Sequence, residues 1–274
     1  MSRLSDAVEM EWASMKGPGC NPGVWDKGSA RFAQHPIPEA VTDDFLRLVS
    51  QTVRFEGNES VLDVGCGAGQ YSIALSRSSR KVLGTDFSES MVAHARLLAE
   101  REGANNVVFE RSDWMEQDVS VPGYSDGFDV TIAHCTPAIG SADSLRKLVS
   151  VTNGWGFVTF CTRRVDVIDR KLGEFVGREF RNAHGADLPA YAFQVLWDMG
   201  IYPLMHYERD VVTTGRMPSA EAVDRVRGML ARSGESNPGA LAKRFVDSIS
   251  EDGEVDSGFR SDFTTVYWDS RSKA

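Results

Sequence analysis

Cysteines are scarce in this sequence, and their spacing excludes two classes of small domain. The four cysteines among 274 residues show no C-x-x-C motif and no close pairing; they are Cys20, Cys66, Cys135 and Cys161. Disulfide frameworks and zinc sites need closely spaced cysteines. The pattern therefore predicts neither a disulfide scaffold nor a metal site, and it indicates reduced thiols in a cytoplasmic protein.

Long hydrophobic runs are also missing. No stretch approaches the roughly 20 apolar residues that a membrane helix needs. Residues 1–10 lack the pattern of a secretory signal peptide. We therefore expect no membrane association.

Positive charge is in short supply. The chain has 30 Lys and Arg against 39 Asp and Glu, which gives a net charge of -9. Nucleic-acid phosphates favour clustered Lys and Arg. The overall charge argues against a nucleic-acid partner, although a local basic patch would be compatible with it.

The length and composition are those of an ordinary globular protein. The hydrophobic share is 42% and the charged share 25%. A chain of this length is near the upper size of one hydrophobic core. We therefore expect a single domain over residues 1–274, with an N-terminal helical cap at 1–55, a ligand-binding core at 56–165, and helical insertions within 166–274.

One stretch, Val61–Ser72, organises the rest. Val61, Leu62 and Val64 predict a strand buried on both faces. Three glycines at alternate positions follow, where the missing Cβ atoms allow a sharp turn and a close ligand. Free N–H groups at the start of the next helix favour an anionic group there. An ordinary tight turn between strand and helix is the alternative.

The glycine spacing narrows the choice of ligand. Dinucleotide-binding folds use G-x-G-x-x-G, whereas Gly65, Gly67 and Gly69 form G-x-G-x-G, with Asp63 two residues before the first. This pattern resembles the first motif of the class I S-adenosylmethionine-dependent methyltransferases. The resemblance implies that the loop, including Cys66, holds the methionine portion of the cofactor, and that Asp63 helps to place its amino group.

A second acid lies at the expected distance. Lys81–Asp86 predicts a second strand, and Asp86 follows Gly65 by 21 residues (86 − 65). A carboxylate about 20 residues on can accept hydrogen bonds from ribose hydroxyls. It can also cap the helix that begins near Ser88. The family resemblance extends the cofactor site to Phe87 and Met91.

The third strand, Val107–Glu110, precedes a segment similar to the family's adenine-binding segment. The resemblance implies that Ser112 and Asp113 contact the adenine and that Trp114 covers its ring. Trp114 is equally compatible with a place in the hydrophobic core.

The fourth strand, Phe128–Ala133, ends at His134. In this family the carboxyl end of that strand lies beside the reactive methyl group. His134 is therefore a candidate general base, since histidine titrates near neutral pH; contact with the cofactor and capping of the strand are the alternatives. The acid-or-Asn, Pro-Pro, aromatic signature of amino-methylating nucleic-acid enzymes is absent here.

The remaining pattern completes an α/β fold. Further strands are expected at Gly156–Cys161, near Pro203–Arg209 and at Asp262–Trp268, and helices at 41–55, 163–184, 219–233 and 239–249. The resemblance implies a Rossmann-like, seven-stranded, mostly parallel sheet with helices on both faces and helical insertions forming a substrate cap. Trp25 and Phe32 predict an N-terminal helix that either closes over the cofactor or packs on the domain. His184 and His206 are candidates for the acceptor pocket.

Three functions remain open at this point. The first is a methyltransferase that acts on a small molecule, as a monomer or homodimer, with S-adenosylmethionine as cofactor. The second is a methyltransferase that acts on protein or RNA. The third is a non-catalytic module that binds S-adenosylmethionine or a nicotinamide cofactor, although the glycine spacing argues against nicotinamide.

Overall fold

The structure is a computed structural model that describes residues 3–15, 21–180 and 185–272. Its contacts divide the chain into two compact units. Unit 1 comprises Met1–Phe160, Asp187–Tyr207 and Thr264–Ala274, and unit 2 comprises Cys161–Ala186 and Glu208–Phe263. The chain crosses between the units within three long strands, β5, β6 and β9, whose bounds follow.

A seven-stranded sheet has the order β3-β2-β1-β4-β5-β9-β6. The neighbouring pairs β3-β2, β2-β1, β1-β4 and β4-β5 are parallel. This order confirms the predicted Rossmann-like α/β class. The strands are β1 Ser60–Val64, β2 Lys81–Asp86, β3 Val107–Arg111, β4 Phe128–His134, β5 Thr152–Asp166, β6 Leu204–Thr213 and β9 Phe259–Asp269.

Strand β1 lies inside the sheet, between β2 and β4. Its five residues are all buried, and Val61, Leu62 and Val64 are fully inaccessible to solvent. A strand covered by helices on both sides has no solvent-facing side, which explains why its apolar residues do not alternate with exposed ones.

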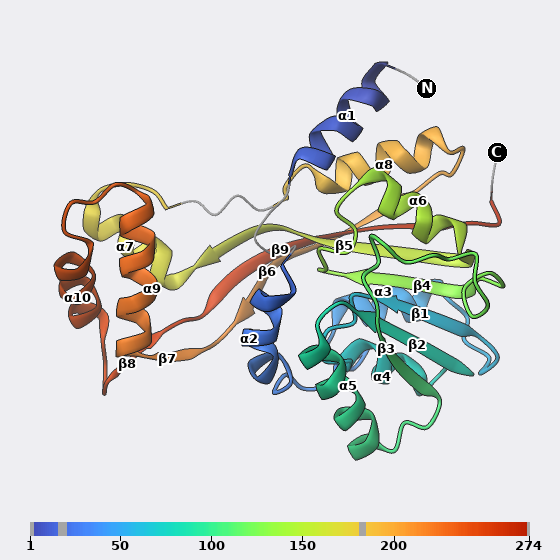
Figure 1. Cartoon of the computed structure of the whole chain (residues 1–274), viewed down its shortest axis with the longest axis horizontal. Helices are drawn as coiled ribbons and strands as arrows, with labels where there is room; N and C mark the ends of the chain where they lie inside the picture. The colour runs from blue at the N-terminus through green and yellow to red at the C-terminus, as the bar shows by residue number, and fades with distance from the viewer. Residues whose placement is uncertain (1–2, 16–20, 181–184, 273–274) are drawn as a thin grey trace. The chain divides into compact units, whose positions relative to one another are not determined.

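Helices cover both faces of the sheet (Figure 1). Phe45 and Val49 of α3 pack on one face, which α4 and α5 also cover, and Leu145 and Leu148 of α6 pack on the other with α8 and α1. The helices of unit 1 are α1 Arg3–Ser14, α2 Pro22–Phe32, α3 Asp44–Thr52, α4 Gln70–Ser76, α5 Glu89–Glu102, α6 Ala142–Ser150 and α8 Leu188–Asp198.

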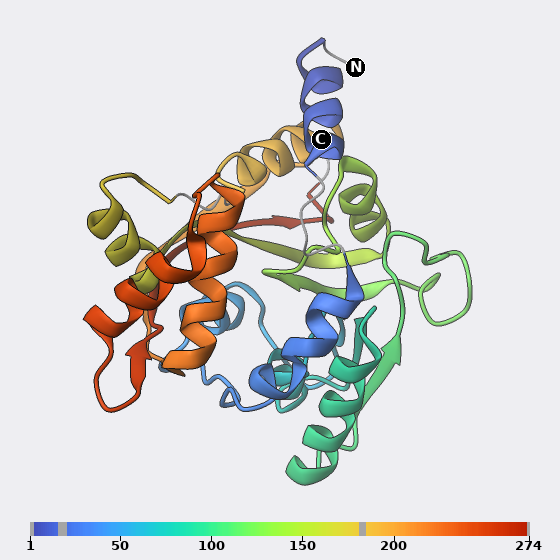
Figure 2. The same ribbon diagram turned by 60° about the vertical axis from the view of Figure 1, so that its left-hand side comes forward.

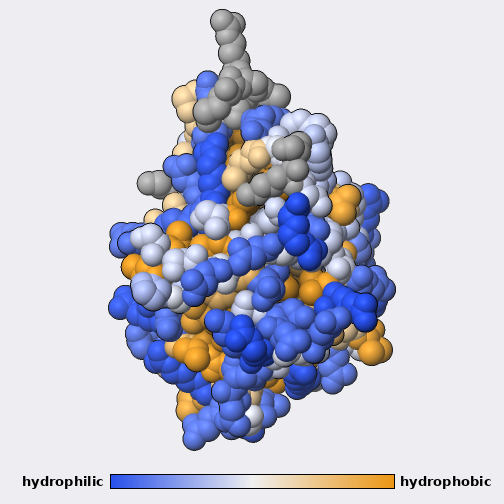
Figure 3. All heavy atoms as spheres, turned by 90° about the vertical axis from the view of Figure 1, so that its right-hand side faces the viewer, coloured by the Kyte–Doolittle hydropathy of each residue, from blue (hydrophilic) through white to orange (hydrophobic). Residues whose placement is uncertain are grey.

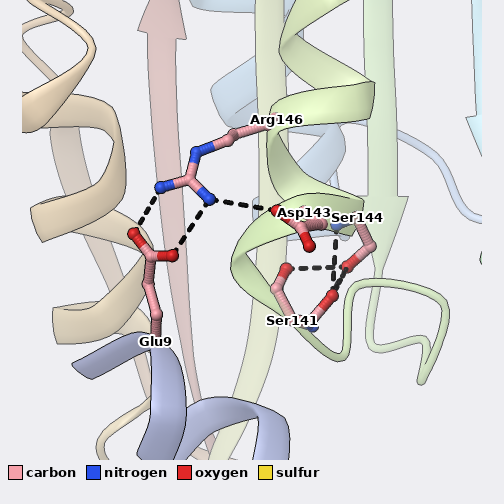
Figure 4. Close-up of polar contacts among 5 residues, drawn as sticks. All are labelled: Glu9, Ser141, Asp143, Ser144 and Arg146. Atoms are coloured by element: carbon pink, nitrogen blue, oxygen red, sulfur yellow. Dashed lines mark hydrogen bonds and ion pairs between the residues drawn. The ribbon is translucent and has the colours of Figure 1, made fainter. Parts of the chain in front are cut away.

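The first helix, α1, is anchored by one buried aromatic and one ion pair. Trp12 is 1% exposed and lies in the core between Phe160 and Tyr191. Glu9 pairs with Arg146 of α6, which also reaches Asp143 at 3.1 Å (Figure 4). The sequence analysis expected a helical cap over residues 1–55 but did not locate this helix within it.

The second helix, α2, coincides with the predicted aromatic helix. Asn21 caps it by accepting a hydrogen bond from the Gly23 N–H. The Trp25 and Phe32 rings lie 5.6 Å apart, so they pack on each other. Cys20, which precedes this helix, lies outside the described residues.

Unit 2 is built around a small core of its own, in which Ile168, Leu172, Val226, Leu230 and Phe245 are fully or almost fully buried. Its helices are α7 Val167–Val176, α9 Ser219–Arg232 and α10 Pro238–Ile249, and a two-stranded antiparallel sheet joins β7 Arg216–Pro218 to β8 Glu254–Asp256.

The helix predicted over residues 163–184 is wrong at its start. Strand β5 continues to Asp166, which caps α7 by accepting from the Ile168 N–H. The strand is prolonged because Thr162 donates to the Asp262 carbonyl, a residue one hundred positions later. His184 lies outside the described residues.

The surface seen in Figure 3 is mixed. Hydrophobic side chains lie in small groups among hydrophilic ones on the face turned toward the viewer. Within the described parts of the chain, every helix is too short or too polar to cross a membrane.

Candidate functional site

The loop after β1 needs glycine for two separate reasons. Gly65, Gly67 and Gly69 all have positive φ, at 71°, 54° and 87°, a region that side chains other than glycine disfavour. A Cβ on Gly65 would also overlap the hydroxyl of Thr136, and a Cβ on Gly69 would lie 2.7 Å from the Phe109 ring. The loop is therefore held close to the sheet edge.

Asp86, at the carboxyl end of β2, joins two turns. One carboxylate oxygen accepts from the Gly67 N–H at 3.0 Å, and the other accepts from the Ser88 N–H at 2.9 Å. The side chain is 7% exposed, and burial raises its pKa. Each carboxylate oxygen can accept a second hydrogen bond, so the group can still bind a ligand hydroxyl.

Asp63 lies beneath the loop. It is 2% exposed and accepts a hydrogen bond of 2.6 Å from the hydroxyl of Ser72. Burial raises the pKa of Asp63 to about 7, and the nearby charge of Asp86 contributes in the same direction. Asp63 is therefore poised to change its charge when a cation binds beside it.

A cavity of about 360 Å³ opens at the carboxyl edge of the sheet in unit 1. Residues that follow β1, β2, β3 and β4 line it, together with the end of α1. Its lining comprises Ala13, Met15, Gly65, Asp86, Phe87, Ser112, Asp113, Trp114, Met115, Thr136, Pro137, Ala138, Gly140 and Ser141. The volume and the position at the strand ends suit a nucleoside-sized ligand.

Half of the predicted cofactor residues line this cavity, and half do not. Those that do are Gly65, Asp86, Phe87, Ser112, Asp113 and Trp114. Those that do not are Asp63, Cys66, Gly67, Gly69, Met91 and His134. Most of the second group lies in or under the glycine loop; Met91 is a core residue of α5 at 2% exposure.

The third strand end contributes one exposed acid and one buried ring. Asp113 is exposed, and its carboxylate accepts from the Met115 N–H. Trp114 is 2% exposed and belongs to the core, where its indole N–H donates to the Ser144 carbonyl at 3.1 Å. Trp114 therefore forms part of the cavity wall and supports the core at the same time.

His134, at the end of β4, packs against two aromatic rings that also contact each other. Its ring centre is 4.6 Å from that of Phe45 and 4.4 Å from that of Tyr71. Burial lowers the pKa of His134 to about 4. The imidazole is therefore neutral at physiological pH, which leaves it able to accept a proton but makes it a weak base.

The buried position of His134 determines which kinetic results would identify it as the general base. If His134 is the base, His134→Ala should lower kcat by about 10²–10⁴-fold with cofactor affinity nearly unchanged. The wild-type pH–rate profile should then lose activity only near pH 4, because the imidazole stays neutral above it. Steady-state kinetics of the variant and of the wild type from pH 4 to 9 would measure both.

Other results would assign His134 differently. A change confined to cofactor affinity indicates that it positions the cofactor. An unchanged kcat with a lower melting temperature would show that His134 is not the base and that its role is to pack against Phe45 and Tyr71.

The sequence analysis missed the other eight residues that line the cavity, among them Thr136, Met115 and Met15. Thr136, just beyond β4, packs against Gly65, and its hydroxyl accepts from the Ala138 N–H. Met115 and Met15 present exposed apolar side chains at the rim. Thr136 could have been predicted from the sequence, because it follows the end of a predicted strand. Met15 could not, since the helix before it was not located.

His206, a candidate for the acceptor pocket, is placed by α3. Its Nε2 lies 2.6 Å from a carboxylate oxygen of Asp44, and Arg47 pairs with the same side chain. His206 is about one-third exposed. It does not line the cavity described above.

Comparison with known proteins gives one domain match and several partial relatives. Residues 55–189 match the family model described as a methyltransferase domain. An uncharacterised protein of Haemophilus influenzae is 26% identical over 58% of this chain and 57% of its own length. A 23S rRNA (uracil(1939)-C(5))-methyltransferase of Xanthomonas euvesicatoria is 32% identical over 33% of this chain and 20% of its own. The chain thus spans less than two thirds of either relative.

One solved structure shares the fold at low identity, and a second is reported beside it. Precorrin 8w decarboxylase of Methanobacterium thermoautotrophicum superposes with a TM-score of 0.51 at 16% identity, over 85% of this chain and 92% of that one. Magnesium protoporphyrin IX methyltransferase of Synechocystis, with bound S-adenosylhomocysteine, gives 0.47 at 17% identity, over 96% and 98%.

Proposed function

We propose that the chain, whose residues 55–189 match a methyltransferase domain and whose strand-end motifs resemble those of the class I S-adenosylmethionine-dependent methyltransferases, methylates a small-molecule acceptor. S-adenosylmethionine is the cofactor of this family. The observation that carries the proposal is the cavity at the ends of β1 to β4, where Gly65, Asp86 and Asp113 come together.

The residues present suit the cofactor's separate parts. The carboxylate of Asp86 keeps acceptor capacity for ribose hydroxyls, and Ser112 and Asp113 offer polar groups at the adenine end. The glycine loop permits close approach of the methionine portion, with Asp63 beneath it. Phe87 and Met115 supply apolar surface at the cavity. We propose these residues as the cofactor site.

When bound, the cofactor would supply an electrophilic methyl group on its sulfonium: an acceptor lone pair would form a bond to the methyl carbon in line with the carbon–sulfur bond, which breaks to release S-adenosylhomocysteine. The protein's contribution is then chiefly to hold the acceptor behind that methyl carbon, which is worth up to roughly 7–11 kcal/mol. A base is needed only where the acceptor loses a proton at or before the transition state. His134 stays a candidate for that role.

Two features support a small acceptor. The net charge of -9 is unfavourable for nucleic acid. The segment after β4 is His134-Cys135-Thr136-Pro137, which lacks the nucleic-acid amino-methylation signature.

The direct test is methyl transfer from methyl-labelled S-adenosylmethionine into a metabolite extract, with identification of the labelled product. We expect label in a small molecule with the wild type and at least tenfold less with Asp86→Ala, which removes the ribose acceptor. Calorimetry on the same pair should show weaker cofactor binding for the variant. Binding of NADH, with neither S-adenosylmethionine nor S-adenosylhomocysteine bound, would refute the proposal.

An RNA acceptor is the second candidate, because one partial relative is a 23S rRNA methyltransferase. Tight, salt-sensitive RNA binding in a gel-shift series at low salt would favour it over the small-molecule acceptor. Cytoplasmic location, single-domain organisation and a monomeric or homodimeric state stay predictions.

A further inference from the structure

The helix α2 is attached to both turns that form the proposed cofactor site. At one end, the Gln70 amide, directly after Gly69, donates to the Phe32 carbonyl at 2.7 Å. Nearer the other end, Asp26 accepts a hydrogen bond of 2.5 Å from the hydroxyl of Ser88. Figure 2 shows α2 beside α5. One helix therefore bridges the glycine loop and the turn after β2.

Ser88 links Asp26 to the ribose-binding candidate Asp86. Its hydroxyl donates to Asp26 and accepts from the Met91 N–H at 3.1 Å, which caps α5. Its own N–H donates to Asp86 at 2.9 Å. Ser88 is completely buried, so water cannot replace these partners, and the three hydrogen bonds together fix its backbone.

Asp26 is exposed and comes from a helix more than sixty residues earlier in the chain. Besides Ser88, its carboxylate interacts with Ser90, whose N–H lies 3.4 Å away, and with the charge of Arg111. Its negative charge at the start of α5 is favourable to the helix dipole. The core of unit 1 does not depend on it.

We propose that Asp26 is a positioning residue for the cofactor, acting through Ser88 on the carboxylate of Asp86, and that docking of α2 and cofactor binding are therefore coupled. The inference rests on the proposed function. Coupling of this kind is reciprocal, so the cofactor must also stabilise the docked helix.

The experiment measures S-adenosylhomocysteine binding by calorimetry, which needs no acceptor. Asp26→Ala should raise Kd by about tenfold, the size expected for loss of a hydrogen bond to a charged group, while kcat at saturating cofactor is retained. Asp26→Asn keeps an acceptor oxygen and should recover most of the affinity. Lys27→Ala, an exposed neighbour on α2, is the matched control and should bind as the wild type.

Two further measurements separate positioning from a general loss of order. In a double-mutant cycle, Asp26→Ala should add little to Ser88→Ala, since both remove the same link. Hydrogen exchange of residues 22–32 should slow on adding S-adenosylhomocysteine to the wild type and change little in Asp26→Ala.

The outcomes are distinguishable. If the wild type binds the ligand and Asp26→Ala binds it equally well, or if the effects of the two substitutions simply add, this inference is wrong and the proposed function stands. If the wild type binds neither S-adenosylmethionine nor S-adenosylhomocysteine, both fail.

Discussion

Gly65→Ala is expected to reduce cofactor affinity at least a hundredfold. An alanine Cβ would overlap the Thr136 hydroxyl and lie 2.5 Å from its Cβ, and the φ of 71° is unfavourable for alanine as well. Moving the loop to relieve the clash would disturb the Gly67 N–H bond to Asp86. Calorimetry with S-adenosylhomocysteine, alongside circular dichroism to confirm folding, measures the loss.

Gly67→Ala is the matched control for that variant. Gly67 has the same sign of φ, at 54°, but a Cβ there would meet nothing within 4 Å. Gly67→Ala should therefore lose only the free energy of holding an alanine at a positive φ, about 1–2 kcal/mol. Replacing Thr136 by glycine in the Gly65→Ala background should restore part of the affinity. Equal losses for both alanine variants would show that backbone conformation, and not the contact with Thr136, governs the site.

Cofactor affinity is expected to rise with pH until about 7 and then level off, through Asp63. Burial raises the pKa of this carboxyl to about 7, so much of it is neutral below that pH. If Asp63 places the cofactor's cationic amino group, binding needs the ionised form and must release a proton. Affinity should then fall by up to tenfold per pH unit below 7.

The same carboxyl makes the stability of the ligand-free protein fall as the pH rises, which is opposite to the trend in cofactor affinity. Its folded-state pKa is raised above the ordinary value of 3.8, so the folded state holds the proton more tightly than the unfolded state. Its contribution to stability is full below about pH 4 and is lost as pH rises through 7. Relative to wild type, Asp63→Asn should gain stability over that interval, by about 1.4 kcal/mol per unit of pKa shift.

Calorimetry in two buffers of different ionisation enthalpy, from pH 5.5 to 8, would count the protons released on binding. Asp63→Asn should remove the pH dependence and bind weakly throughout. The pKa of Asp86 is also raised by burial, so Asp86→Asn tests whether that carboxyl causes the titration. This variant should keep the pH dependence of cofactor affinity. An unchanged profile in Asp63→Asn would assign the titration elsewhere.

The cofactor half of the fold could be predicted because its signals are local. Val61 to Ser72 contains a strand, a turn and the start of a helix, and the burial of β1 and the positive φ angles follow directly from those residues. Asp86 could be placed because a strand end fixes where its side chain lies. These features depend on neighbours within the same supersecondary unit.

The missed features depend on distant partners. Helix α1 is held by Trp12 in the core and by Glu9 with Arg146, more than 130 positions away. The extension of β5 to Asp166 depends on contacts such as that of Thr162 with Asp262. Strands β7 and β8 have three residues each, too few for a periodic pattern. The pattern of a single segment cannot contain such information.

The place of β9 in the sheet has a consequence for biosynthesis. This strand, Phe259–Asp269, lies between β5 and β6, which precede it in the chain. During translation β6 has no neighbour in the sheet until β9 has been made, and pairing over such sequence distances is slow. Nascent chains stalled before β9 should therefore expose the edges of β5 and β6 and engage chaperones, and synthesis of β9 should complete the sheet.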